Sequence, residues 1–129
     1  MIAYHFYLNI ILACPFKSRK DVHRLQSYNA IMERLKSCIY HVDLQVLDNE
    51  ASALYHQLIT DKWKADFQLV LTNIHRCNTA ERDIRTFKAH FLAILARVAP
   101  DYPRNMWDLL IPQTKLTLNL MRQTRLDHT

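Results

Sequence analysis

The chain has 129 residues, half of them hydrophobic and 22% charged, which is typical of one folded globular domain and excludes a disordered chain. It contains no glycine, which excludes the Gly-rich loops that cradle nucleotide phosphates. Seventeen Lys and Arg residues against twelve Asp and Glu residues give a formal net charge of +5, and this balance suits a polyanionic partner.

The first fourteen residues are apolar and rich in β-favouring side chains, and they predict strands at residues 2–7 and 9–14. Leu8-Asn9 is either a tight connection between two strands or a position inside one longer strand. The run is too short for the ~20 residues of a membrane span and has no basic residue ahead of it, as a signal peptide requires. Pro15 closes the run. Apolar residues then recur every three or four positions, which predicts an amphipathic helix at residues 19–39.

Strands and helices alternate in the middle of the chain. The pattern predicts a strand at residues 43–47 that ends at Asp48, a short helix at 50–60 and a strand at 66–71. This order argues for an α/β layered domain. Ligands of open α/β sheets bind beyond the carboxyl ends of strands, where Asp48 falls.

Two helical stretches complete the chain. A long helix is predicted at residues 79–98, and its apolar side follows Ile84, Phe87, Phe91, Leu95 and Val98. Pro100 and Pro103 break the pattern, and a last helical stretch follows at about 104–123. Pro112 should kink or divide that stretch.

The three cysteines, Cys14, Cys38 and Cys77, are an odd number without paired spacing, and they form no zinc pattern with the histidines near them. This usage predicts a reducing intracellular setting, cytoplasm or nucleus.

Asp48 and Glu81 are the carboxylates with the most suggestive positions. Asp48 can hold Mg²⁺ through oxygen at a strand end, or it can turn the chain and cap the next helix. Glu81 stands three residues after Asn78, which is the capping-box spacing.

Basic residues follow Glu81 on the same helix. At about 100° per residue, Arg85 and Lys88 lie within about 40° of Glu81 and form one ridge with it. Arg76 and Arg82 extend the basic zone. The ridge is either a Glu–Arg pair on a solvated helix, worth ~0.2–0.5 kcal/mol, or a metal-binding carboxylate beside cations that follow a phosphate backbone.

Three stretches together resemble a known family: LQVLDNEAS, FQLVLTNIHRCNTAERDIRTFKAHF and WDLLIPQTKLTLNLMRQTR. In this order and spacing they are similar to the integrase catalytic core of copia-type retrotransposons, over nearly the whole chain. The resemblance implies a single RNase H-like domain with a mixed sheet, residues 1–99 being the core remnant and 100–129 a C-terminal helical extension.

The resemblance also implies an Asp, Asp, Glu triad that holds two Mg²⁺ or Mn²⁺ ions for phosphodiester strand transfer on DNA. Asp48 matches the second carboxylate and Glu81 the third, as catalytic residues and metal ligands. Arg85 and Lys88 match positions where integrases place DNA-contacting residues.

The chain departs from the family in ways that argue against activity. The strand with the first Asp would precede residue 1, so we expect an N-terminally truncated core without its first central strand. The hairpin at 2–14 and the strand at 43–47 would then lose their shared neighbour. His5 and Tyr7 stand where acidic residues are expected. We therefore expect no strand transfer, and weak or no divalent-ion binding.

Two other functions stay open. The chain can be a non-enzymatic DNA- or RNA-binding remnant that uses Arg76, Arg82, Arg85 and Lys88. It can also be an α/β interaction module whose C-terminal helices bury Trp107 and leucines against a protein partner, either a second copy or the rest of an integrase polyprotein. Neither a membrane nor a small-molecule substrate is expected.

Overall fold

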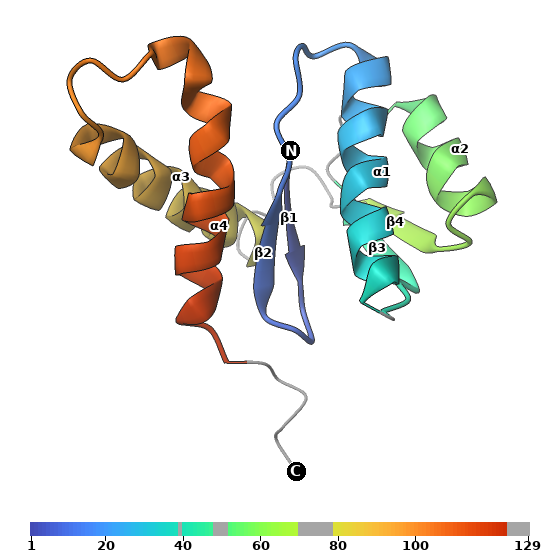
Figure 1. The fold of residues 1–129 in the computed structure, drawn as a ribbon. Coiled ribbons are helices and arrows are strands. Elements are labelled where there is room, and N and C mark those ends of the chain that lie inside the picture. Colours follow the sequence, from blue (N-terminus) through green and yellow to red (C-terminus); the bar gives the residue numbers. More distant parts are fainter. Residues whose placement is uncertain (39, 48–51, 70–78, 124–129) are drawn as a thin grey trace. The chain divides into compact units, whose positions relative to one another are not determined.

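The computed structural model describes residues 1–38, 40–47, 52–69 and 79–123 of the chain. It has the expected order of strands and helices (Figure 1). The chain divides into two compact units, of which unit 1 comprises Met1–Pro15 and Thr79–Thr129 and unit 2 comprises Phe16–Asn78.

Unit 1 begins with a hairpin of β1 (Ile2–His5) and β2 (Ile10–Ala13), paired antiparallel with Ile2 opposite Ala13. Both strands are shorter than predicted because the four residues between them form a turn. Asn9 ends this turn with a φ of 51°, a left-handed conformation that Asn tolerates better than most residues. The Tyr4 hydroxyl donates to Asn9 Oδ1 at 2.9 Å and holds the turn closed.

His5 also serves the turn, because its Nδ1 accepts a hydrogen bond of 3.3 Å from the Leu8 N–H. Burial lowers the pKa of His5, which favours the neutral ring that can accept this bond. Tyr7 is 63% exposed. These are the two positions where the integrase resemblance leads one to expect acidic residues.

The helices of unit 1 are α3 (Thr79–Arg97), the 3₁₀ helix η2 (Arg104–Leu110) and α4 (Ile111–Leu120). Helix α3 agrees with the prediction for residues 79–98. Its Phe87 is buried, while Ile84, Phe91 and Leu95 are half-buried. Phe87 packs with residues of β2 and α4, and the buried cluster consists of Ile11, Ala13, Phe87 and Ile111.

The last helical stretch is divided, as Pro112 led us to expect. The 3₁₀ helix ends at Leu110, and α4 begins at Ile111, one residue before Pro112. Proline is tolerated in the first turn of an α-helix because the N–H it lacks would have no partner within the helix. Pro112 therefore starts α4 and does not kink it.

Unit 2 contains α1 (Asp21–Ser37), β3 (Leu44–Leu47), α2 (Ala53–Asp61) and β4 (Asp66–Leu69). Strands β3 and β4 pair in parallel, with Leu44 opposite Asp66. Helix α2 starts later than predicted, because the Ser52 side chain caps it by accepting a hydrogen bond from the Tyr55 N–H.

The core of unit 2 joins both helices to the sheet. Ile59 is fully buried. Tyr28 of α1 packs against Tyr55 of α2 with ring centres 4.8 Å apart, and the Tyr28 hydroxyl donates to Gln45 Oε1 of β3. The ring of Phe67 in β4 stacks on the ring of His56 in α2, with ring centres 4.3 Å apart.

The fold class is therefore mixed α/β, as predicted. The described residues form two separate two-stranded sheets, β1–β2 and β3–β4, and the more specific RNase H-like arrangement stays a prediction. No helix in the described part of the chain is long and apolar enough to cross a membrane.

Candidate nucleic-acid interface

The predicted site residues fall partly within the described structure. Asp48 and Arg76 lie outside the described residues. Glu81, Arg82 and Arg85 lie in the first two turns of α3, and Lys88 lies one turn further on. The structure therefore bears on the helical part of the predicted site, and the approach of Asp48 to Glu81 stays a prediction.

The basic residues of α3 point to solvent. Arg82, Arg85 and Lys88 are exposed and Glu81 is half-buried, whereas Asp83 is 2% exposed. At about 100° per residue, Arg85 lies about 160° and Lys88 about 140° around the helix from Asp83. Arg85 and Lys88 thus face away from the core, because the buried side of α3 includes Asp83.

The charges of this face are not neutralised within the described part of the chain. None of Arg82, Arg85 and Lys88 forms an ion pair there, and the Glu81–Arg85 pair that the spacing allows is not made. The simple account of the ridge as a helix-stabilising ion pair therefore has no salt bridge to support it. Three cations remain available to a partner of negative charge.

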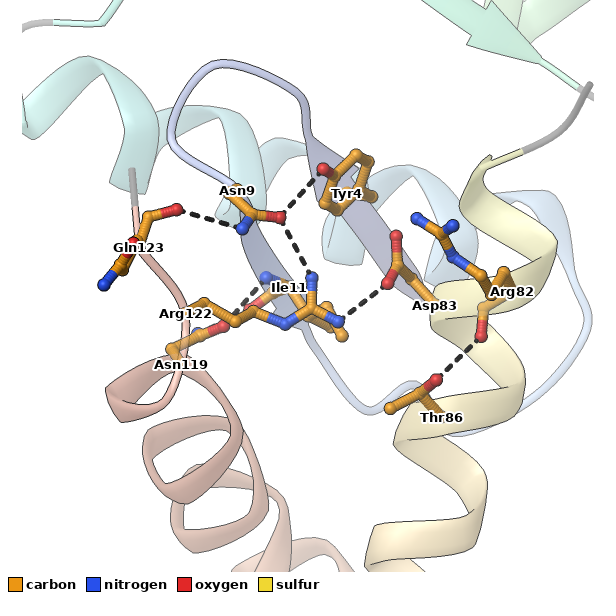
Figure 2. Close-up of polar contacts among 9 residues, drawn as sticks. All are labelled: Tyr4, Asn9, Ile11, Arg82, Asp83, Thr86, Asn119, Arg122 and Gln123. Atoms are coloured by element: carbon orange, nitrogen blue, oxygen red, sulfur yellow. Dashed lines mark hydrogen bonds and ion pairs between the residues drawn. The ribbon is translucent and has the colours of Figure 1, made fainter. Parts of the chain in front are cut away.

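Helix α3 is fixed in place by a buried ion pair that the sequence pattern did not predict (Figure 2). The Arg122 guanidinium donates from Nη2 to Asp83 Oδ1 at 2.7 Å, with the side chains 17% and 3% exposed. The same guanidinium donates from Nη1 to Asn9 Oδ1 at 3.4 Å and lies 5.9 Å from the ring centre of Tyr4. One cation thus joins α3 and the hairpin to the segment after α4.

A sequence signal for Asp83 was present. It stands four residues before Phe87 and eight before Phe91, so it lies on the apolar stripe that predicts the buried side of α3. A carboxylate there needs a cation, because a buried charge is costly unless it is paired. The partner could not be identified in the same way, because Arg122 is 39 positions away in the chain.

Within residues 1–38, 40–47, 52–69 and 79–123, no three His, Cys, Asp or Glu side chains gather as ligands. The site implied by the resemblance combines Glu81 with Asp48, which lies outside those residues.

No family model, no curated protein and no solved structure matches the chain. The likeness to integrase cores consequently rests on the motif residues of the sequence.

Proposed function

We propose that this chain binds nucleic acid through the outer face of α3 and derives from an integrase-type catalytic core, without transferring DNA strands by itself. The observation that carries the proposal is the exposure of Arg82, Arg85 and Lys88 on one helix, with no ion pair to any described residue. The net charge of +5 acts in the same direction.

The spacing of the cations suits a phosphate backbone. From Arg82 to Lys88 the helix rises about 9 Å at 1.5 Å per residue, which is close to the rise of three nucleotides at ~3.4 Å each. Each phosphate that a cation neutralises releases counterions, so the binding constant falls as salt rises. Contacts of this type give affinity without base specificity.

The origin of the chain is supported by its element order and its sheets. The order agrees with the resemblance. The described residues form one antiparallel and one parallel strand pair, as a mixed α/β chain requires.

The proposed lack of strand transfer has a chemical reason. Hard divalent ions need several oxygen ligands, and the residues that match the family supply two carboxylates, Asp48 and Glu81, where the triad has three.

The test is DNA affinity measured against salt concentration for the Arg85→Ala/Lys88→Ala variant. We expect weaker binding to all sequences alike and a salt dependence that is flatter by about one unit of slope for each phosphate that the variant leaves without a cation. The matched control is Arg34→Ala/Lys36→Ala, which removes one exposed Arg and one exposed Lys from the last turn of α1. An equal reduction of DNA affinity in the control would show that affinity follows the net charge of the chain. That result would contradict a binding site on α3.

Cleavage assays with Mg²⁺ and Mn²⁺ test the second half of the proposal, with Glu81→Gln as the control. We expect no cleavage by the unmodified chain. Cleavage that disappears in Glu81→Gln would show that the chain is an active enzyme.

One observation favours the alternative that the chain is a protein-interaction module. Trp107 of η2 is 42% exposed and meets the Phe91 ring edge-on, and three leucines nearby in the chain are more exposed still: Leu109, Leu116 and Leu120. Large exposed apolar side chains are characteristic of protein interfaces. A complete absence of salt-dependent DNA binding would favour this alternative.

A further inference from the structure

Positive charge gathers where the chain enters α1, in unit 2 (Figure 1). Residues 17–24 contain one carboxylate and four cations, and these cations form the α1 entry cluster: Lys17, Arg19, Lys20 and Arg24. The first three of them are exposed, and Arg24 is half-buried. None of the four forms an ion pair with a described residue. The start of α1 therefore presents a net positive charge to solvent.

These cations do not stabilise the helix that they precede. The N-terminus of a helix carries partial positive charge, so a cation beside it is unfavourable. Lys20 is the N-cap residue of α1, where Ser, Thr, Asp and Asn are preferred, and no side chain caps the helix there. Asp21, the acidic residue of the first turn, offsets part of this charge. The last turn of α1 has the favourable arrangement, because Arg34 and Lys36 lie beside the partial negative charge of the C-terminus.

Hydrogen bonds of Ser18 hold the backbone that carries the exposed cations. Ser18 Oγ lies 2.7 Å from His23 Nδ1 of the first turn of α1, and it accepts a 3.4 Å hydrogen bond from the Lys20 N–H. Arg19 and Lys20 stand between the two residues that this contact joins. A binding surface that is already held in place loses less conformational entropy when its ligand binds.

We propose that the α1 entry cluster is a further phosphate-binding site of the chain, for the backbone of a nucleic acid. Such a backbone supplies the negative charge that the four side chains lack, and contacts with it need only charge. An anionic membrane surface suits the cluster less, because stable membrane binding also needs large apolar side chains beside the cations. Within residues 16–24, all of which are described, Val22 is the only large hydrophobic side chain that is exposed.

The test is the affinity of the full chain for a short DNA duplex, measured against salt concentration for Arg19→Ala/Lys20→Ala. We expect weaker binding and a salt slope that is flatter by about two units, one for each phosphate that loses its cation. The loss of affinity should therefore be about tenfold larger at 50 mM salt than at 200 mM. The matched control, Arg34→Ala/Lys36→Ala, removes the same two charges from the other end of α1 and should keep the original slope. An equal loss in the control would overturn the proposal.

Urea unfolding is a second measurement, in which the two variants should move in opposite directions. Arg19→Ala/Lys20→Ala should raise the urea midpoint of unit 2, because it removes positive charge from the N-terminus of α1. Arg34→Ala/Lys36→Ala should lower that midpoint, because it removes positive charge from the C-terminus. An affinity that falls while stability rises excludes partial unfolding as its cause. A lower midpoint in Arg19→Ala/Lys20→Ala would assign the loss of affinity to folding and overturn the proposal.

A charge-conserving variant and a vesicle assay identify the ligand. Arg19→Lys/Lys20→Arg keeps both charges and should bind DNA with the affinity and salt slope of the unmodified chain. A large loss of affinity in this variant would contradict a contact made by charge. Binding to phosphatidylserine vesicles that requires Arg19 and Lys20, without binding to DNA, would make the ligand a membrane surface and overturn the proposal.

Combined variants separate this site from the face of α3, which lies in unit 1 and on which the inference does not rest. Adding Arg85→Ala/Lys88→Ala to Arg19→Ala/Lys20→Ala should flatten the salt slope further, because two sites then lose cations. If the α3 variant alone lost affinity, the site at the start of α1 would be refuted and binding by α3 would stand. If the α1 variant alone lost affinity, the site at the start of α1 would be supported and binding by α3 would be contradicted.

Discussion

A carboxylate that is 3% exposed needs a cation beside it, and for Asp83 that cation is Arg122 at 2.7 Å. Because Arg122 also contacts Asn9 and the face of Tyr4, the pair fixes both the position of α3 and the end of the hairpin turn. The outward direction of the basic face of α3 thus depends on a buried charge on the opposite side of the same helix.

At the residue scale, we predict that Arg122→Ala lowers the free energy of unfolding of unit 1 by about 3–5 kcal/mol, because it leaves the Asp83 carboxylate buried and unpaired. Replacing both partners, as in Asp83→Leu/Arg122→Met, should cost less than Arg122→Ala alone. Urea unfolding measures both variants. Arg97→Ala removes an exposed cation from α3 and should change stability by less than ~0.5 kcal/mol. A similar destabilisation in Arg97→Ala would refute the special role of the pair.

A second residue-scale prediction concerns Tyr28, whose pKa burial raises to about 12. Above the ordinary tyrosine pKa of 10.0, the unfolded chain loses this proton while the folded unit 2 keeps it. Stability from this source is therefore full below about pH 10 and is lost as the pH rises toward 12. Tyr28→Phe should weaken the alkaline loss, which urea unfolding at a series of alkaline pH values would measure. An unchanged pH profile in Tyr28→Phe would assign the loss to other groups.

At the scale of elements, the local sequence pattern was sufficient to predict a helix that buries one apolar face. The three-to-four-residue period of Phe87 and Phe91 placed α3 to within one residue of its observed end. The period alone could not set the direction of the basic ridge, because that direction depends on the burial of Asp83, and the apolar stripe does not identify the cation that such a carboxylate needs. Its burial requires Arg122, and contacts between distant residues carry no periodic signal.

Turn and cap chemistry explains most other differences between predicted and observed elements. The hairpin strands are shorter because His5 and Asn9 build a four-residue turn from side-chain hydrogen bonds. Helix α2 begins after Ser52 because that hydroxyl caps it. The two hydrogen bonds between the Asn119 side chain and the backbone of Ile11 had no sequence signal, because an Asn in the last turn of a helix is ordinarily a solvent-facing residue.

At the scale of the whole molecule, each unit has a core of its own. Phe87 and Ile11 belong to the core of unit 1, and the fully buried Ile59 belongs to that of unit 2. Regions with separate cores can open separately, with different free energies. The two units therefore offer a reciprocal pair of core substitutions.

We predict that Ile59→Ala, at a cost of about 2–5 kcal/mol for an Ile-to-Ala change in a core, speeds amide hydrogen exchange in α1, α2 and the β3–β4 pair. Exchange in α3 and the hairpin should change little. Phe87→Ala should do the reverse, since its cavity opens between α3, β2 and α4 and costs about 3–5 kcal/mol. Hydrogen exchange followed by mass spectrometry of peptides from both units measures the two patterns in one experiment. If either substitution accelerated exchange equally in both units, the chain would unfold as one cooperative body. The proposed nucleic-acid-binding face of α3 would then depend on the core of unit 2 as much as on its own.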